Sequence, residues 1–423
     1  MNALLSSPVP VWAIAAVSTL GVITRPFRLP EAVWAVLGAL ALCGLGMLPW
    51  SDALTAVGKG LDVYLFLTGM MVASELARKE GLFDYLAALA AKRASGSAKK
   101  LFLLMYCVGT VVTVFMSNDA TAVVLTPAVI AVAHVVKAEK PLPYLYICAF
   151  IANAASFALP ISNPANLVIF QDRMPTLLNW LGRFAVPSAL SIVATYLTLR
   201  FMQRQELTQK IESAVEVSEL SAAGKATGLG IVATAVAMLG GSALDVPLGL
   251  PTFCAGLALF VAICVLKGKF LGAHLGEISW TVLPLVAGLF VLVEGLQRTG
   301  VISDLAAVVK SVAASTPAHA GWMSGVVMAV ACNLLNNLPA GLIAGSALTA
   351  AHAPTPVASA VLIGVDLGPN FSVTGSLATI LWLTALRRDG IEVTAWSFLK
   401  LGAVVTLPAL TAALGAVALG ATL

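Results

Sequence analysis

Long apolar stretches, separated by short polar ones, follow one another along the whole chain. Two are extreme, because residues 141–171 and residues 311–365 contain no charged side chain. A helix needs about 20 apolar residues to cross a bilayer, whereas a β-barrel would show short alternating segments. The pattern therefore predicts a polytopic α-helical membrane protein. Its apolar segments lie at about 8–24, 31–49, 61–77, 101–116, 120–136, 143–170, 184–199, 227–243, 251–266, 278–297, 321–335, 338–350, 357–386 and 396–420.

The positive charges between these segments indicate how the chain crosses the membrane. We treat 101–136 and 321–350 as re-entrant helical hairpins, each of which enters the membrane and returns to the same face. Ten spans then remain, and most of the 24 lysine and arginine residues lie on one face. The positive-inside rule assigns that face to the cytoplasm. We therefore expect both termini to lie outside.

The chain also repeats itself, at an offset of 219 positions. The residues that meet at this offset include Glu75 and Glu294, Gly81 and Gly300, and Asn118 and Asn337. Under the topology above, the two copies enter the membrane from opposite sides, so the repeats are inverted. Each repeat is expected to hold five spans, one hairpin and one discontinuous transmembrane helix. The expected organisation is a first repeat at 1–205, a cytoplasmic linker at 206–226 and a second repeat at 227–423.

Three further segments have a distinct polar pattern. The segments 82–95 and 301–314 are amphipathic and precede the two hairpins, so we expect them to lie flat at the membrane interface. The stretch 200–225, which includes most of the linker, is the only sizeable polar segment and is rich in glutamate and glutamine. We interpret it as a solvated connection between the halves.

Four polar clusters interrupt the apolar segments. Two lie at the hairpin tips, and two lie with proline and glycine inside long spans, at 160–166 and 366–376. Such breaks free backbone groups that cannot face lipid, and inverted repeats with broken helices are typical of secondary transporters. The alternative is that these side chains only cap half-helices and hold helices together. We expect one central substrate site, with the candidate residues Ser117, Asn118, Thr121, Ser162, Asn163, Asn166, Asn336, Asn337, Asn370, Thr374 and Ser376.

Four carboxylates are candidates for proton coupling. Asp119 and Asp366 lie within the clusters, where a carboxylate is costly and indicates function by default, and burial away from positive charge favours its protonated form. The alternative is that each caps a half-helix and stays ionised. Leu338 stands opposite Asp119 at the repeat offset, so that acid is present in one half alone. Glu75 and Glu294 lie near span ends, where simple interfacial exposure competes with a role in proton transfer.

Several other classes of function have no support in the sequence. The net charge of +4 does not indicate nucleic-acid binding, and the six cysteines lie singly within apolar runs, as small buried hydrophobic residues do. The chain has no HExxH or GxSxG motif and no GxxxxGK[ST] phosphate loop. We therefore expect no catalytic residue, metal or cofactor, and no hydrolysis of ATP by this chain.

With these motifs in view, the sequence resembles the ArsB-type arsenite/antimonite efflux permeases of the ion-transporter superfamily, over essentially the whole chain. This sequence differs from the sodium–dicarboxylate transporters of the same superfamily at both hairpin tips. The tips are Ser-Asn-Asp and Asn-Asn-Leu here, whereas those relatives have Ser-Asn-Thr at both. That difference weakens any transfer of their sodium sites. The segments that carry the resemblance are SNDATAVVLTPAV (117–129), ISNPANLVIF (161–170), NNLPAGL (336–342) and DLGPNFSVTGSLATILWL (366–383).

The resemblance implies export of arsenite and antimonite across the cell (inner) membrane, in exchange for protons. It leaves open whether a cytoplasmic ArsA-type ATPase docks on the chain. An alternative within transporters is a sodium/proton or organic-anion carrier of the same superfamily. A passive channel ranks lower, because channels present symmetric rings of pore residues, and an intramembrane enzyme ranks last.

Overall fold

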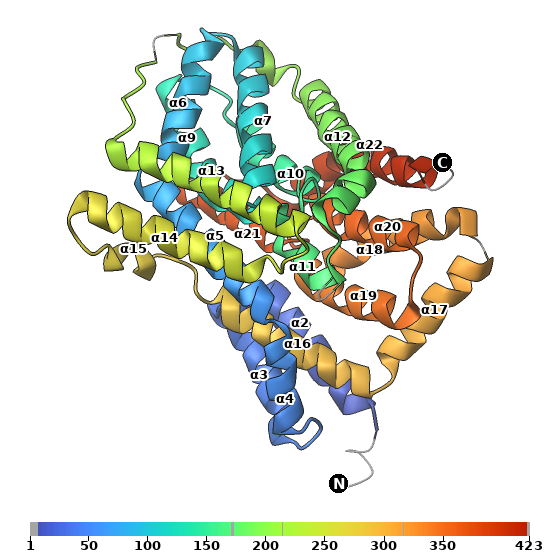
Figure 1. The fold of residues 1–423 in the computed structure, drawn as a ribbon. Helices are drawn as coiled ribbons and strands as arrows, with labels where there is room; N and C mark the ends of the chain where they lie inside the picture. The colour runs from blue at the N-terminus through green and yellow to red at the C-terminus, as the bar shows by residue number, and fades with distance from the viewer. Residues whose placement is uncertain (1–6, 171–172, 214, 316, 421–423) are drawn as a thin grey trace.

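The computed structural model describes residues 7–170, 173–213, 215–315 and 317–420. These residues form helices and loops, and the one β-type pairing among them is an isolated bridge between Ser97 and Lys210. Figure 1 shows the helices packed together, with no sheet among the described residues. The predicted fold class, an all-α membrane protein with broken helices and hairpins in both halves, is confirmed.

The helices of the two halves follow the same order. The first half contains α2 (Val9–Thr24), α3 (Glu31–Gly44), α4 (Trp50–Lys59), α5 (Leu61–Lys79), α6 (Leu82–Ala94), α7 (Ala98–Phe115), α8 (Asn118–Ala120), the π-helical turn η2 (Thr121–Leu125), α9 (Thr126–Val135), α10 (Leu142–Ala154), η3 (Pro160–Ser162), α11 (Pro164–Phe170) and α12 (Leu177–Met202). The second half contains α13 (Ala222–Ala243), α14 (Gly249–Lys267), α15 (Gly272–Gly276), α16 (Val282–Arg298), α17 (Val301–Ser315), α18 (Pro317–Leu335), α19 (Asn337–Ala351), α20 (Thr355–Leu367), η6 (Gly368–Phe371), α21 (Leu377–Arg388) and α22 (Ala395–Gly420).

Matching glycines make the chain turn before each hairpin. Gly81 lies between α5 and α6 with φ +72°, and Gly300 lies between α16 and α17 with φ +87°. Residues with a Cβ atom adopt this left-handed conformation only at a cost, so glycine is favoured at both turns. The turn at Gly300 bends the chain by 77° from α16 to α17. The two amphipathic segments of the sequence are thus separate helices, α6 and α17.

The apolar helices differ in length. Within the described residues, six helices are long and apolar enough to cross a membrane, or up to eight if each of two bent pairs is one span. The bent pairs are α4 with α5 and α16 with α17, while α2, α3 and α10 are apolar but shorter. The apolar helices of this fold therefore vary in length and in straightness, unlike ten equal membrane spans.

The first hairpin begins and ends beside the same stretch of the linker. Ser97, directly before α7, pairs with Lys210, and the Val136 carbonyl, directly after α9, accepts a hydrogen bond from the Glu212 N–H at 2.9 Å. Both ends therefore lie on one face, as the re-entrant interpretation requires.

The linker is not only solvated. Its apolar side chains Leu207, Ile211 and Val215 are four residues apart, and each is at most 9% exposed. They pack into the main hydrophobic core, because apolar side chains gain free energy when they leave water. The expectation of a solvated connection therefore missed this apolar anchor, which holds the linker against the hairpin.

The two halves are interleaved. α5 packs along α14, and α16 packs along α3, so each half contributes one helix to each pair. Small residues permit the close approach: a Cβ atom at Gly69 would meet the backbone of Thr252, and one at Gly288 would meet the backbone of Ala35. Gly69 and Gly288 are themselves 219 positions apart. The same repeat that places the polar clusters therefore also builds the helix pairs around them.

Candidate functional site

The first hairpin tip is held by its own polar side chains. Ser117 Oγ accepts a hydrogen bond from the Ala120 N–H at 3.1 Å, and Asn118 Oδ1 accepts one from the Asp119 N–H at 2.9 Å. Both contacts satisfy donors at the start of a helix, which otherwise have no partner within it. Thr121 Oγ1 lies 2.7 Å from Thr113 Oγ1 on α7. The tip therefore uses its hydroxyl groups partly for capping.

The second hairpin tip is bound to the broken helix of its own half. The Asn337 N–H donates to the Gly375 carbonyl at 2.9 Å, and Asn336 Nδ2 donates to the Thr374 carbonyl at 3.3 Å. Thr374 Oγ1 in turn donates to the carbonyl of Asn333 at 3.3 Å. Asn336 itself has φ +68° and ψ 153°, a backbone conformation that residues other than glycine rarely adopt.

The first helix break lies between α10 and α11. Ser162 Oγ donates to the Val114 carbonyl of α7 at 2.8 Å, while Asn166 Nδ2 contacts three carbonyl oxygens of the break, the shortest being that of Ser156 at 3.0 Å. Asn166 thus satisfies carbonyl groups that the broken helix leaves without partners, and Ser162 joins the break to the end of α7.

Asn163 connects this break to the other half. Its Oδ1 accepts from the Ala165 N–H at 3.0 Å, which caps α11, and its Nδ2 donates to Asp366 Oδ1 at 2.8 Å. Asp366 lies at the end of α20 and is fully buried. Its second oxygen, Oδ2, has no hydrogen-bond partner among the described residues.

The second break holds another contact between the halves. Asn370 Oδ1 accepts from Asn153 Nδ2 on α10 at 2.9 Å, and Asn370 Nδ2 donates to the Phe150 carbonyl at 3.1 Å. Ser376 Oγ accepts from the Thr379 N–H at 3.2 Å and so caps α21. Amides thus join the breaks of the two halves directly.

All four polar clusters reach one small cavity, which we call the central cavity. Its volume is about 10 Å³, roughly the space that one water molecule needs. Each cluster contributes at least one polar side chain, and no lysine or arginine lines the cavity. The lining residues are Leu67, Asn118, Asp119, Asn163, Pro164, Val282, Asn337, Leu338, Ser376, Leu377 and Ala378.

Other predicted site residues lie around this cavity without lining it. Ser117 lines the larger cavity described below, and Asn336 lines a small void beside Leu338. The remaining ones hold the breaks and tips in place through the hydrogen bonds given above. They are Thr121, Ser162, Asn166, Asn370 and Thr374.

A second cavity, which we call the inner vestibule, adjoins the central cavity. It has a volume of about 120 Å³ and shares Leu67, Asp119, Pro164, Val282 and Leu377 with the central cavity. Asp119 therefore stands where the two cavities meet. Its carboxylate has no ion-pair partner among the described residues.

The two other candidate acids lie away from the central cavity, in ion pairs. Glu75 lines the inner vestibule and pairs with Arg78 at 2.6 Å. Arg78 also pairs with Glu277 of the loop before α16, at 2.7 Å. Glu294 pairs with Lys59 at 2.7 Å on the opposite end of the molecule. The carboxylates of Glu75 and Glu294, which are related by the repeat, are therefore each neutralised by a neighbouring base.

The central cavity offers neutral hydrogen-bonding groups and one acid. Asparagine amides supply donors and acceptors, and the serine hydroxyl supplies both. Among the described residues, no group of three or more histidine, cysteine or acidic side chains could hold a metal ion. The amides and the serine hydroxyl can hydrogen-bond hydroxyl groups, although the cavity in this conformation has room for about one water molecule.

Sequence reasoning missed Asn153, which is fully buried at the contact between the halves. The repeat offset shortens after the hairpins, because α10 and α20 begin at Leu142 and Thr355, 213 positions apart. At that offset Asn153 is the counterpart of Asp366. A search for the repeat that allowed a gap would have found this pair of buried polar residues.

Comparisons with known proteins agree with this architecture. The chain is 25% identical over 420 residues to an "Arsenical pump membrane protein" of Escherichia coli, covering 96% of this chain and 97% of that one. It is 25% identical over 392 residues to an uncharacterized transporter of Mycobacterium tuberculosis, covering 90% and 91%. The resemblance found in the motifs is therefore confirmed over nearly the full length.

A solved structure and a family model complete the comparison. The YdaH transporter of Alcanivorax borkumensis, described as having an unusual topology, matches with a TM-score of 0.59 at 16% identity, over 92% of this chain and 97% of that one. That likeness concerns the fold alone. The family model described as "Citrate transporter" matches residues 19–364. Because this match covers most of the chain, the protein belongs to the CitMHS, or citrate transporter, family.

Proposed function

We propose that the protein is a secondary active transporter that exports arsenite and antimonite from the cytoplasm in exchange for protons. The observation that carries the proposal is the central cavity, where the four polar clusters meet and no cationic side chain is present. Relatives of nearly equal length are named arsenical pump membrane proteins, which supports an arsenical as the substrate.

The lining of the central cavity fits an uncharged hydroxide. Arsenite near neutral pH is mostly a neutral trihydroxide, so its recognition needs donors and acceptors rather than a charge clamp. Asn118, Asn163, Asn337 and Ser376 supply these groups. Hydrogen bonds release the substrate faster than thiolates would, and none of the lining residues is a cysteine.

An organic anion is the second candidate, because the family model is described as a citrate transporter. A multiply charged anion would require arginine or lysine in the site to offset its desolvation. The central cavity contains Asp119 and no base, so its charge opposes such a substrate. The neutral hydroxide is therefore the better match.

Asp119 is our candidate for the group that carries the proton. It lines both the central cavity and the inner vestibule, so it can reach the substrate and the water of one membrane face in the same conformation. An exchanger needs such a group, protonated from one side and deprotonated toward the other. Asp366 is a second candidate, because Asn163 joins it to the central cavity.

Growth and accumulation measurements test the substrate assignment. Arsenite-sensitive cells that express the chain should grow at higher arsenite and accumulate less arsenic. Asn118→Leu and Asn337→Leu should remove this protection, because each loses an amide of the central cavity. Asn179→Leu is the matched control, since Asn179 is exposed on α12 and lines none of these cavities. Full protection by both cavity variants would refute the assignment, provided the proteins reach the membrane equally.

A further inference from the structure

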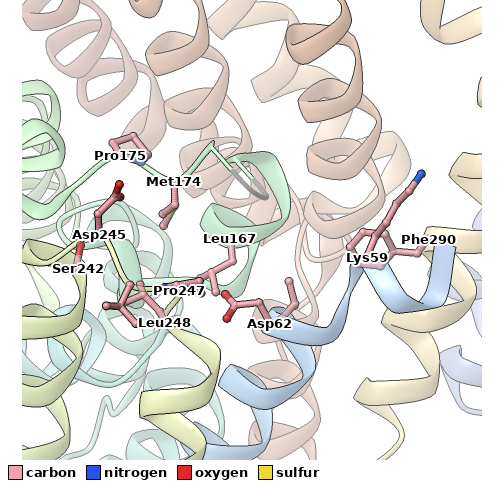
Figure 2. Close-up of a pocket in the computed structure, with 12 residues that line it drawn as sticks. Lys59, Asp62, Leu167, Met174, Pro175, Ser242, Asp245, Pro247, Leu248 and Phe290 are labelled. Atoms are coloured by element: carbon pink, nitrogen blue, oxygen red, sulfur yellow. The ribbon is translucent and has the colours of Figure 1, made fainter. Parts of the chain in front are cut away.

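A third cavity, which we call the outer cavity, lies at the other end of α5. Its volume is about 230 Å³. Figure 2 shows its lining side chains, which come from the α4–α5 turn, from α11 and the segment after it, from the link between α13 and α14, and from α16. They are Lys59, Asp62, Val63, Leu167, Met174, Pro175, Ser242, Asp245, Val246, Pro247, Leu248 and Phe290.

The outer cavity and the central cavity lie one helical turn apart on two helices. On α5, Val63 lines the outer cavity and Leu67, four residues on, lines the central cavity. On α11, Leu167 lines the outer cavity and Pro164, three residues earlier, lines the central cavity. Val63, Leu67 and Leu167 are each 4% exposed. A thin layer of packed apolar side chains therefore separates the two cavities.

The repeat relates the outer cavity to the inner vestibule. Lys59 and Val63 of the outer cavity are 219 positions from Ile278 and Val282 of the inner vestibule. Phe290 of the outer cavity is the same distance from Met71 of the inner vestibule. In an inverted repeat, equivalent residues lie at opposite membrane faces. The outer cavity is thus the counterpart of the inner vestibule on the other face.

The two counterparts differ in their connection to the central cavity. The inner vestibule shares five lining residues with it, and the outer cavity shares none. The inner vestibule therefore adjoins the central cavity directly, whereas the outer cavity is separated from it.

We propose that the outer cavity is the external mouth of the transport route, and that Leu167 and Val63 form the hydrophobic barrier that closes it in this conformation. The inference rests on the proposed function, since it places the exit of the neutral hydroxide and the entry of the proton at this mouth. Constrictions of apolar side chains close such routes by excluding water.

The polar lining of the outer cavity fits a water-filled mouth. Asp62 Oδ1 accepts a hydrogen bond at 2.7 Å from the N–H of Gly249, the first residue of α14, where a carboxylate is favoured by the helix dipole. Asp245 is exposed on the neighbouring link, and the Lys59 ammonium pairs with Glu294. These groups remain solvated in the cavity, whereas the barrier beneath them is apolar.

Cysteine labelling with a membrane-impermeant thiol reagent tests which face each cavity opens to. In a background without the six native cysteines, Asp245→Cys probes the outer cavity and Ser279→Cys probes the inner vestibule. Both native side chains are exposed. Reagent outside intact cells should modify Asp245→Cys alone, and reagent on everted vesicles should modify Ser279→Cys alone. Modification of both from one side, or the reverse pattern, would overturn the proposal.

A second labelling experiment tests the barrier. External reagent should modify Leu67→Cys slowly, and adding Leu167→Ala or the milder Val63→Ala should raise that rate on the order of tenfold by widening the constriction. Leu178→Ala is the control, because Leu178 is 78% exposed on α12. Unchanged labelling in both barrier variants, with Ser279→Cys still modified from the cytoplasm to show a folded protein, would refute the barrier. Labelling needs neither arsenite nor a pH gradient, so its result is independent of the proposed substrate.

Discussion

Asn163 links the central cavity to the buried acid Asp366, so its replacement should affect both stability and transport. Asn163→Leu removes the cap of the Ala165 N–H, worth about 1 kcal/mol. It also leaves Asp366 with neither carboxylate oxygen bonded by a described residue, at a cost of about 1–3 kcal/mol. The sum is about 2–4 kcal/mol, which is smaller than the free energy of unfolding of typical folded proteins, roughly 5–15 kcal/mol. We expect the variant to fold, to unfold at a lower temperature, and to transport no arsenite.

A double-mutant cycle separates the contact from the cap. If the 2.8 Å hydrogen bond between Asn163 and Asp366 is energetically important, Asn163→Leu with Asp366→Leu should be less destabilised than the sum of the two single variants. The expected difference is about 1–3 kcal/mol, read from unfolding of the purified proteins in detergent. Additive effects, or normal arsenite transport by Asn163→Leu at equal protein levels, would refute the reasoning.

Three further predictions address coupling, the turns and the ion pairs of Glu277. Asp119→Asn should still bind arsenite but lose transport driven by a pH gradient, and unchanged pH-driven transport would exclude this acid. Gly300→Ala should lower thermal stability by about 1–2 kcal/mol because of its φ of +87°, whereas Gly240→Ala, within a helix and equally uncrowded, should not lower it. Hydrogen bonds from Lys79 and Arg78 lower the pKa of Glu277 below its ordinary value of 4.5. A lowered carboxylate pKa gives stability that is present above the ordinary value and is lost as the pH falls through the lowered one. Glu277→Gln should therefore leave the shape of the transport pH profile near neutrality unchanged, and a shifted profile would assign this acid a coupling role.

Much of the fold could be predicted from the sequence, because membrane helices and their breaks leave strong local signals. Continuous apolar runs marked the helices, and prolines such as Pro164 and Pro369 marked the places where they break. One offset of 219 positions that pairs Glu75 with Glu294, Gly81 with Gly300 and Asn118 with Asn337 indicated the repeat. The structure adds that both glycines have a left-handed backbone. These features depend on nearby residues, so the chain itself carries them.

The roles of individual polar residues were harder to predict. Asn118 and Asn337 line the central cavity, whereas Asn166 and Asn370 bond to backbone or to another amide. All four look alike in sequence, and only their packing decides which one faces open space. Asn153 was missed because insertions and deletions change the repeat offset after the hairpins.

The burial of the linker was also hard to predict, because it too depends on packing. Its composition predicted solvation, but Leu207 and Ile211 are buried against the hairpin. Scattered apolar residues in a polar stretch give no periodic signal long enough to indicate an element. Contact with a distant part of the chain, here the ends of α7 and α9, decides their burial.

Arsenite uptake by everted membrane vesicles tests the central claim most directly. In such vesicles the cytoplasmic face is outside, so an exchanger that exports arsenite against protons should accumulate arsenite when the lumen is acidic. We expect accumulation to need the acidic lumen, to stop when a protonophore collapses the pH gradient, and to proceed without sodium or ATP. Accumulation that is unchanged by the protonophore, or that needs a sodium gradient, would contradict proton-coupled export by this chain.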